Sequence, residues 1–565
     1  MTTTKPPDLP ELAKKSSIDP TVLWIAAAVA AVFVILGVVA TESLSSITTS
    51  VQGWVINSFG WVFVLVSTGF VVLSIYLAVS RYGRIRLGGD DERPEFSTVS
   101  WVAMMFSAGM GIGLMFYGAA EPLFHLTAPS KGEGRFIDPT TAPGSTERAQ
   151  QAMEYSFFHW AFHPWAMYAV VGLALAYFCF RKGKPNLIST AFFPLIGEKS
   201  RGGIGKAIDI FAIFATLFGS AVSLGLGALQ INSGLTTLWD FPKSDALAIG
   251  IILVLTVAFV ASAVSGVHRG IQFLSNTNMV LAIVLLAFLF VVGPTVFILN
   301  TFSESLGDYL FELVPMSFRA GAFGGQDWLA AWSIFYWAWW ISWTPFVGTF
   351  IARISRGRTI REFIVGVVLV PSVVSFVWFS VLGGAAIDVQ RGGTDLTDGG
   401  KAAEDGILYN LLAEYPMFTV TAIVVMILVA LFFISGADAA SIVMGTLSSR
   451  GALEPGKGVT IMWGVLTGLV AAVLLLAGGL PALKTLCIIA AFPFLLIMVG
   501  ACWGLMKELR KEPLVAELDQ HVLAGVLRDS GYAPVKGAGK GNGAKTQTDE
   551  EPETSKVEAA PADES

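Results

Sequence analysis

The sequence predicts an all-α integral membrane protein with twelve transmembrane helices, and three observations support this fold class. Of the 565 residues, 54% are hydrophobic and only 14% are charged, and the mean hydropathy is +0.67. Twelve apolar runs are each long enough, at roughly twenty residues, to cross a bilayer as a helix. Lys and Arg concentrate in alternate connections, on the side of the N-terminal arm. By the positive-inside rule, both termini are expected in the cytoplasm.

The expected spans divide the chain into a polar N-terminal arm, two extra helices, two sets of five helices with a connection between them, and a tail. The corresponding segments are 1–21, 22–98, 99–300, 301–327 (the connection), 328–507 and 508–565. The spans lie near 22–40, 60–80, 101–119, 156–180, 207–238, 246–265, 272–299, 328–352, 362–387, 417–447, 459–479 and 483–506. The amphipathic, acidic connection is expected to lie along the outer surface. The acidic tail, rich in Pro, Ala and Gly, is typical of disorder.

Each of the two larger segments holds five spans, which is an odd number. The second set therefore starts from the opposite side of the membrane, and this is the topology of inverted repeats. No residue-level repeat accompanies it, so the prediction rests on counting spans and on an interruption expected at the start of each set.

The first interruption is predicted in the third span, where Gly109, Gly111 and Gly113 occupy alternate positions. Glycine is unfavourable within a helix, and one explanation is close helix packing through small residues. The other is an unwound stretch at a midplane binding site, which exposes backbone carbonyls to a cation and amides to an anion. Because the corresponding eighth span is also expected to be interrupted, the sequence favours the binding site. The stretch 120–154 is expected to be an outside connection.

The fourth span carries an aromatic cluster, in which Trp165 and Tyr168 share a helix face. His159 and His163 are four residues apart, which is a spacing that metal-ligating pairs use on helices. No carboxylate or Cys accompanies them, so the sequence does not favour a metal site here.

Polar residues inside the fifth and tenth spans are further candidates. Thr216 and Ser220 place two hydroxyl groups on one face of the fifth span. Such pairs usually bond to the backbone or between helices, but beside an aromatic site they also suit a small hard cation. Asp438 in the tenth span is an intramembrane acid, which indicates either a functional group or a hydrogen bond between helices.

The eighth span is the most informative stretch, because four Trp residues fall within seven positions shortly before Pro345. Aromatic residues recur at spacings of three and four, which predicts one stripe on a helix. The stripe comprises Trp332, Tyr336, Trp339, Trp343, Phe346 and Phe350, with Trp337 and Trp340 beside it. Pro345 removes a backbone donor in mid-span and predicts an interruption there.

Two interpretations of this aromatic stripe compete. Trp is common as an interfacial belt and as packing between membrane helices, but a belt would place the rings at the two ends of the span. These rings run through its middle. The pattern therefore favours an aromatic box for a quaternary ammonium group, which cannot donate hydrogen bonds and is attracted to ring faces.

Other function classes find little support. The residues Cys179, Cys487 and Cys502 lie in apolar segments and show neither metal nor disulfide spacing. The sequence has no Walker loop, no HExxH motif and no nucleophile–base arrangement, so it does not indicate an enzyme or a sensor. A channel is harder to exclude on composition, although a channel would need no alternating gate.

Six stretches of the sequence resemble the betaine/choline/carnitine transporter family, and most closely its sodium-coupled glycine betaine members. They are MMFSAGMGIGLMFYGAAEP, HWAFHPWAMYAVVGLALAY, SLGLGALQ, SGVHRGIQFLSNTNMVLA, IFYWAWWISWTPFVGTFIARISRGRTIREF and FFISGADAASIVMGT. The resemblance covers roughly 100–450 and fades at both ends. It implies a leucine-transporter-like core of two inverted five-helix repeats, preceded by two extra N-terminal helices, in a homotrimer.

The resemblance also implies a substrate site and two sodium sites. The substrate ammonium would lie in an aromatic box, next to the unwound backbone of the third span: Trp160, Trp165, Tyr168, Trp339, Trp340 and Trp343, with Gly109, Met110, Gly111 and Gly113. One sodium ion would bind Ser107, Met110, Phe432, Ser435 and Gly436. A second would bind Thr216, Ser220, Phe346 and Tyr168.

Three features of the sequence refine what the resemblance implies. Choline-type members tend to carry Asp where this chain has Gly113, which favours a zwitterion. Family members usually have adjacent hydroxyl residues in the tenth span, whereas Ser435 is followed here by Gly436, so the sodium stoichiometry stays open. The tail beyond Lys511 is acidic, unlike the basic tail of osmosensing members, so osmotic regulation through anionic lipid is not implied.

Together these features predict a secondary transporter in the cell membrane that takes up glycine betaine, or a related quaternary-ammonium zwitterion, with Na+ for osmoprotection. The alternatives are a sodium-coupled or sodium-independent transporter of ectoine, proline, carnitine or choline. The expected partners are the substrate, sodium, membrane lipid and further copies of the chain. No organic cofactor and no nucleic acid are expected.

Overall fold

The computed structural model describes residues 18–513 except 110, 128–141, 266–267 and 401. Within this part of the chain every regular element is helical, and the one extended pairing is an isolated bridge between Arg86 and Thr359. The predicted all-α class is therefore confirmed. Among the described residues, eight helices are long and apolar enough to span a membrane, or nine if the bent pair α11–α12 is one span.

The helices follow one another with few long connections. The first half contains α2 (Pro20–Val39), α3 (Thr41–Val79), α4 (Thr98–Gly109), α5 (Ile112–Thr127), α6 (Thr146–Trp160), α7 (Phe162–Ala176), α8 (Phe193–Ile196), α9 (Gly203–Trp239), α10 (Asp245–Ser265) and α11 (His268–Val292). The second half contains α12 (Thr295–Ser317), α13 (Gln326–Leu329), α14 (Phe335–Ile354), α15 (Ile360–Arg391), α16 (Ile407–Ala413), α17 (Phe418–Ser448) and α18 (Lys457–Leu509). Short 3₁₀ or π-helical turns cover Arg81–Arg84, Tyr177–Arg181, Ile188–Phe192, Gly197–Arg201 and Ala330–Ile334.

The eight long helices and the twelve expected spans differ where helices are broken or merged. The third expected span is divided between the short helices α4 and α5. The eighth expected span corresponds to α14. None of these three helices is among the eight that are long and apolar enough to cross a membrane. The last two expected spans both fall within α18, whose backbone leaves the helical conformation at Gly478 and Gly479. The count of twelve and the inverted-repeat arrangement remain predictions.

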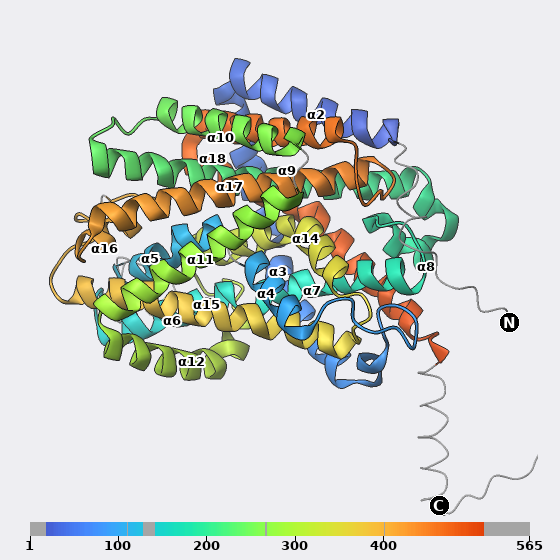
Figure 1. Ribbon diagram of the computed structural model, residues 1–565, viewed down its shortest axis with the longest axis horizontal. Coiled ribbons are helices and arrows are strands. Elements are labelled where there is room, and N and C mark those ends of the chain that lie inside the picture. Colours follow the sequence, from blue (N-terminus) through green and yellow to red (C-terminus); the bar gives the residue numbers. More distant parts are fainter. Residues whose placement is uncertain (1–17, 110, 128–141, 266–267, 401, 514–565) are drawn as a thin grey trace, which may run out of the picture. The chain divides into compact units, whose positions relative to one another are not determined.

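Burial separates the middle of the helical assembly from its periphery. Trp337 and Trp339 on α14 and Trp378 on α15 are fully enclosed. Large apolar side chains are exposed along the outer helices, such as Trp24 on α2 and Val254 on α10, as expected for surfaces that meet lipid. Figure 1 shows α2 and α12 at opposite margins, with α14 between them.

The connection between the two sets of helices is itself helical. Helix α12 is bent by 109° from α11, and Pro294 lies at the bend because proline cannot continue a helix. Leu310, Phe311 and Val314 on α12 are exposed. The helix begins at Thr295, six residues before the boundary expected from the sequence.

Two helix breaks lie beside each other within the first set of five expected spans. Helix α4 ends at Gly109 and α5 begins at Ile112, so the helix is interrupted at the glycine run as predicted. Helix α6 ends at Trp160 and α7 begins at Phe162. This second break was not predicted. Its physical cause is Pro164, which has no N–H group to donate to the carbonyl of Trp160.

The interruption predicted at Pro345 is wrong, because α14 is continuous through it. Proline removes only the hydrogen bond to the carbonyl four residues earlier, and nearby hydroxyl groups can stabilise a membrane helix around such a site. Thr344 donates to the carbonyl of Trp340 at 2.8 Å, and Thr349 donates to the carbonyl of Pro345 at 2.6 Å. The irregular turn lies upstream instead, in the π-helical segment Ala330–Ile334.

Candidate functional site

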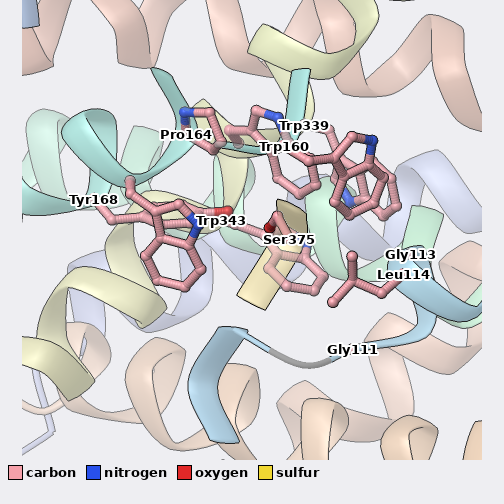
Figure 2. A pocket seen from close by; sticks show the side chains of 11 residues that line it. Gly111, Gly113, Leu114, Trp160, Pro164, Tyr168, Trp339, Trp343 and Ser375 are labelled. Atoms are coloured by element: carbon pink, nitrogen blue, oxygen red, sulfur yellow. The ribbon is translucent and has the colours of Figure 1, made fainter. Parts of the chain in front are cut away.

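Residues of α5, α6, α7, α14 and α15, with Gly111 just before α5, line a cavity of about 30 Å³. It is lined by Gly111, Gly113, Leu114, Trp160, Pro164, Trp165, Tyr168, Trp339, Trp340, Trp343 and Ser375. Figure 2 shows Gly111 and Gly113 at the α4–α5 interruption, with the rings of Trp160, Trp339 and Trp343 gathered beside them. All six aromatic residues predicted for the box belong to this lining.

The glycine run supplies one wall of the cavity. A Cβ atom at Gly113 would lie 2.7 Å from the ring of Trp160 and 2.8 Å from the ring of Trp339. A Cβ atom at Gly111 would lie 3.5 Å from Trp343, which is ordinary contact. Gly113 therefore allows α5 to approach two box rings more closely than any other residue would permit. Gly109 ends α4, and Met110 lies outside the described residues.

The aromatic rings pack closely on one another. Trp339 and Trp340 are stacked, with ring centroids 4.9 Å apart and an interplanar angle of 11°. The rings of Trp160 and Trp340 meet edge to face at 4.8 Å, and those of Trp165 and Tyr168 do so at 5.3 Å. The cavity between them has room for about two water molecules. A trimethylammonium group is larger, so binding one requires the rings to separate.

Four of the box indoles donate their N–H groups to protein atoms outside the lining. Trp339 donates to Oγ of Ser223 at 3.2 Å. Trp340 and Trp343 donate to backbone carbonyls, those of His159 at 3.0 Å and Gly219 at 3.2 Å. Trp160 donates to a carboxylate, Oε2 of Glu121, at 2.7 Å. With these donors engaged, ring faces and edges are what the indoles can offer to a ligand.

Sequence reasoning missed Glu121. The third span was expected to end at 119, which placed this acid in an outside connection, whereas α5 continues to Thr127 and Glu121 is completely buried. Its second partner at Oε2 is the hydroxyl group of Tyr336, at 2.6 Å. An acidic residue so close to the end of an apolar run was the signal that could have located it.

The expectation that no carboxylate accompanies His159 is also wrong. Nδ1 of His159 lies 2.6 Å from Oε1 of Glu121, and its Nε2 lies 2.8 Å from Oγ of Ser333. His125 adds a second imidazole, with Nε2 3.5 Å from the same carboxylate. The side-chain atoms of Glu121, His125 and His159 that could bind a metal ion lie within 4.8 Å of one another. The 2.6 Å distance between Nδ1 of His159 and Oε1 of Glu121 is that of a hydrogen bond. His163 instead stacks on Trp337, at 5.0 Å.

The second predicted sodium site contains two buried hydroxyl groups that have no hydrogen-bond partner among the described residues, Ser220 Oγ and the phenol oxygen of Tyr168. Buried polar atoms without a partner need an explanation, and hydroxyl oxygen is a suitable ligand for a hard cation. Thr216 donates to the carbonyl of Ala212 at 2.9 Å, which leaves lone pairs on its oxygen. Phe346 packs against Trp343, with ring centroids 5.1 Å apart.

The first predicted sodium site lies only partly within the described residues. Met110 is outside them, and so is the side chain of Ser107. On α17, Ser435 bonds through Oγ to the carbonyl of Phe432 at 3.3 Å, and the space beside Gly436 is open. Asp438, on the same helix, forms a hydrogen bond with Ser262 of α10. This contact agrees with the interpretation of Asp438 as a link between helices.

Comparisons with known proteins give a consistent family. Residues 21–514 match the betaine/carnitine/choline family transporter (BCCT) family. The glycine betaine transporter OpuD of Bacillus subtilis is 47% identical over 504 residues, which are 88% of this chain and 96% of that protein. A probable glycine betaine transporter of Desulfitobacterium hafniense is 43% identical over 87% of this chain and 98% of its own length.

A third relative is named for two substrates. The betaine/ectoine transporter LcoP of Corynebacterium glutamicum is 41% identical over 506 residues, which are 88% of this chain and 79% of that protein.

Proposed function

The chain belongs to the betaine/carnitine/choline transporter family, and from this premise we propose that it takes up glycine betaine, or a related quaternary-ammonium zwitterion, together with Na+. The observation that carries the proposal is the cavity on which five helices converge: α5 at its interrupted start, α6, α7, α14 and α15. Six aromatic side chains line it.

The two ends of a betaine molecule suit the two walls of this cavity. Its quaternary ammonium group cannot donate hydrogen bonds, and each ring face attracts it by roughly 0.5–2 kcal/mol depending on desolvation. Its carboxylate suits the first turn of α5, where backbone N–H groups have no partner within the helix. Gly111 and Gly113 bring this backbone to the cavity without an acidic side chain of their own. A counter-charge to a net cation is therefore lacking at Gly113, which favours a zwitterion over choline.

Sodium is proposed to bind beside the box. Tyr168 is shared between the cavity lining and the second sodium site, so an ion held by Ser220, Thr216 and Phe346 would stabilise the same arrangement of α7 and α9 that the substrate selects. The site of Ser107, Met110, Phe432, Ser435 and Gly436 would act on the α4–α5 interruption in the same way. Because each ligand selects one conformation, sodium and betaine would strengthen each other's binding.

The assembly and location follow from the family resemblance and the charge pattern. We place the protein in the cell membrane as a homotrimer, with both termini in the cytoplasm and with betaine serving as a compatible solute. The acidic tail gives no reason to assign it the lipid-linked osmosensing of members with basic tails.

Uptake by purified protein in liposomes tests the proposal. Labelled glycine betaine is expected to accumulate against its gradient when Na+ is high outside, and only to equilibrate when K+ replaces Na+ on both sides. Accumulation without sodium would refute the coupling, and no saturable uptake of betaine would refute the substrate.

Ectoine is the second candidate substrate, since a relative that is 41% identical carries both betaine and ectoine in its name. Counterflow from betaine-loaded liposomes, with labelled ectoine, proline, carnitine and choline outside, ranks the alternatives directly.

A further inference from the structure

Glu121 differs from the other groups that hold the box indoles in place. Trp339, Trp340 and Trp343 donate to a hydroxyl oxygen or to backbone carbonyls, all of which are neutral. Trp160 donates to Oε2 of Glu121 at 2.7 Å, which is shorter than the other three bonds. Short distances of this kind are typical of hydrogen bonds to a charged acceptor.

The surroundings of Glu121 are those of an ionised carboxylate. Three donors converge on its two oxygens: the Trp160 indole, the Tyr336 hydroxyl at 2.6 Å and Nδ1 of His159 at 2.6 Å. An ionised carboxylate accepts at both oxygens and donates nothing. Nδ1 of His159 then carries the hydrogen that it shares with Oε1, and its Nε2 pairs with the hydroxyl group of Ser333 at 2.8 Å.

A negative charge bonded to an indole N–H alters what the ring offers to a cation. The charge draws the N–H hydrogen toward itself and pushes electron density into the ring, so the ring face becomes more negative. Cation–π attraction is electrostatic and depends on that face. Trp160 lines the cavity, and its ring centroid lies 4.8 Å from that of Trp340. The more negative ring face is therefore part of the aromatic box that would contact the ammonium group.

We propose that Glu121 sets the preference of the box for a positively charged headgroup over a neutral one of the same shape, acting through the indole of Trp160. It is a positioning and specificity residue that touches no substrate itself, since it is absent from the cavity lining. This inference rests on the proposed function, because it assumes that the cavity takes a quaternary ammonium group.

The test compares two ligands that differ only in charge. Glycine betaine is set against its carbon isostere, in which a tert-butyl group replaces the trimethylammonium group and the carboxylate is kept. Binding of both to the full-length protein, purified in detergent with Na+, is measured by tryptophan fluorescence or calorimetry. In Glu121→Gln the affinity for glycine betaine is expected to fall about tenfold relative to that for the isostere.

A matched control separates charge from lost structure. Ser223→Ala removes the acceptor of the Trp339 indole, which is neutral, and is expected to leave the ratio of the two affinities within about twofold of wild type. If Glu121→Gln weakens both ligands equally, Glu121 is only structural and the inference is wrong. If wild type binds neither ligand, the proposed function fails and the inference fails with it.

A second variant covers the case in which Glu121→Gln does not fold. Benzothienylalanine at position 160 replaces the indole N–H with sulfur and leaves both the ring shape and Glu121 in place. Like Glu121→Gln, this variant is expected to lower the affinity for glycine betaine relative to the affinity for the isostere. An unchanged ratio in this folded variant would overturn the inference without affecting the proposed function.

Discussion

Gly113 sets the distance between α5 and two rings of the box. Because a Cβ atom there would lie within 2.8 Å of both Trp160 and Trp339, Gly113→Ala is expected to displace a ring and weaken glycine betaine binding about tenfold, toward the lower end of the range for overpacking. Gly111→Ala is the control, since its Cβ would make only ordinary contact with Trp343. Equal affinities of the two variants for betaine in a binding assay would contradict this role.

Trp340 lies at the centre of the box, since its ring stacks on Trp339 and meets Trp160 edge to face. Trp340→Leu removes one cation–π face and is expected to raise the KM for betaine uptake roughly tenfold. Trp463→Leu is the matched control, because Trp463 is equally buried and donates to Ser448 without lining the cavity. That variant is expected to lose thermal stability and keep its KM. A wild-type KM in Trp340→Leu would count against the box.

Ser220 is a buried hydroxyl without a hydrogen-bond partner among the described residues. If it binds sodium, Ser220→Ala should raise the Na+ concentration needed for half-maximal uptake about fivefold, as expected for losing about 1 kcal/mol. Ser67 on α3 is equally buried and also lacks a partner. Ser67→Ala should leave the sodium curve unchanged, and identical curves for both variants would exclude Ser220 as a ligand.

At the scale of elements, the α6–α7 break aims Trp160 at the cavity. Pro164→Ala restores the missing N–H donor and favours a continuous helix, so the variant is expected to be at least as stable as wild type but to show a KM about tenfold higher. Pro371 lies inside continuous α15. Pro371→Ala is therefore expected to leave KM near wild type. The combined measurement is thermal unfolding and uptake kinetics, and an unaltered KM in Pro164→Ala would show that the break is incidental.

The end of α18 is tied to the end of α7 by Glu512. Burial disfavours its charge, but hydrogen bonds from Arg181, Lys182 and Tyr177 outweigh burial and lower the pKa of Glu512 from 4.5 to about 2. A lowered pKa means that this stabilisation is complete above about pH 4.5 and is lost as the pH falls toward 2. Nothing from this group changes between pH 7 and 5.

Glu512→Gln is therefore expected to lower stability at pH 7 by about 1.5–3 kcal/mol, the range for hydrogen bonds to a charged group. The gap between variant and wild type should narrow as the pH falls below about 4.5. Thermal unfolding in detergent between pH 7 and 3.5 measures it, and a gap that widens in acid would contradict the assigned charge state.

At the scale of the whole molecule, the membrane class, the family and most of the cavity lining were predictable from the sequence. Composition and the placement of Lys and Arg carry the first of these, and local motifs of aromatic residues and glycines carry the rest. Such features involve residues close together in the sequence, so they can be recognised without knowing the tertiary contacts. The six box aromatics come from only two stretches, around Trp160 and around Trp340.

The sequence did not reveal what depends on distant partners or on competing local bonds. Glu121 looked like a loop acid because its donors, Trp160 and Tyr336, lie 39 and 215 residues away. Pro345 predicts a break, but the hydroxyl groups of Thr344 and Thr349 stabilise the helix around it. The sequence alone does not show whether such hydroxyl groups bond to the helix backbone. Pro164 lies within a run of aromatic residues that does not by itself predict a break, yet its missing N–H donor separates α6 from α7.

The central claim is that the cavity between α5, α6, α7 and α14 opens to hold a quaternary ammonium group. Cryo-electron microscopy of the protein in lipid, with glycine betaine and Na+, tests this most directly. We predict density for the trimethylammonium group among Trp160, Trp339 and Trp340, with the rings farther apart than the 4.8 and 4.9 Å found here. Betaine density elsewhere, with these rings still in contact, would contradict the account.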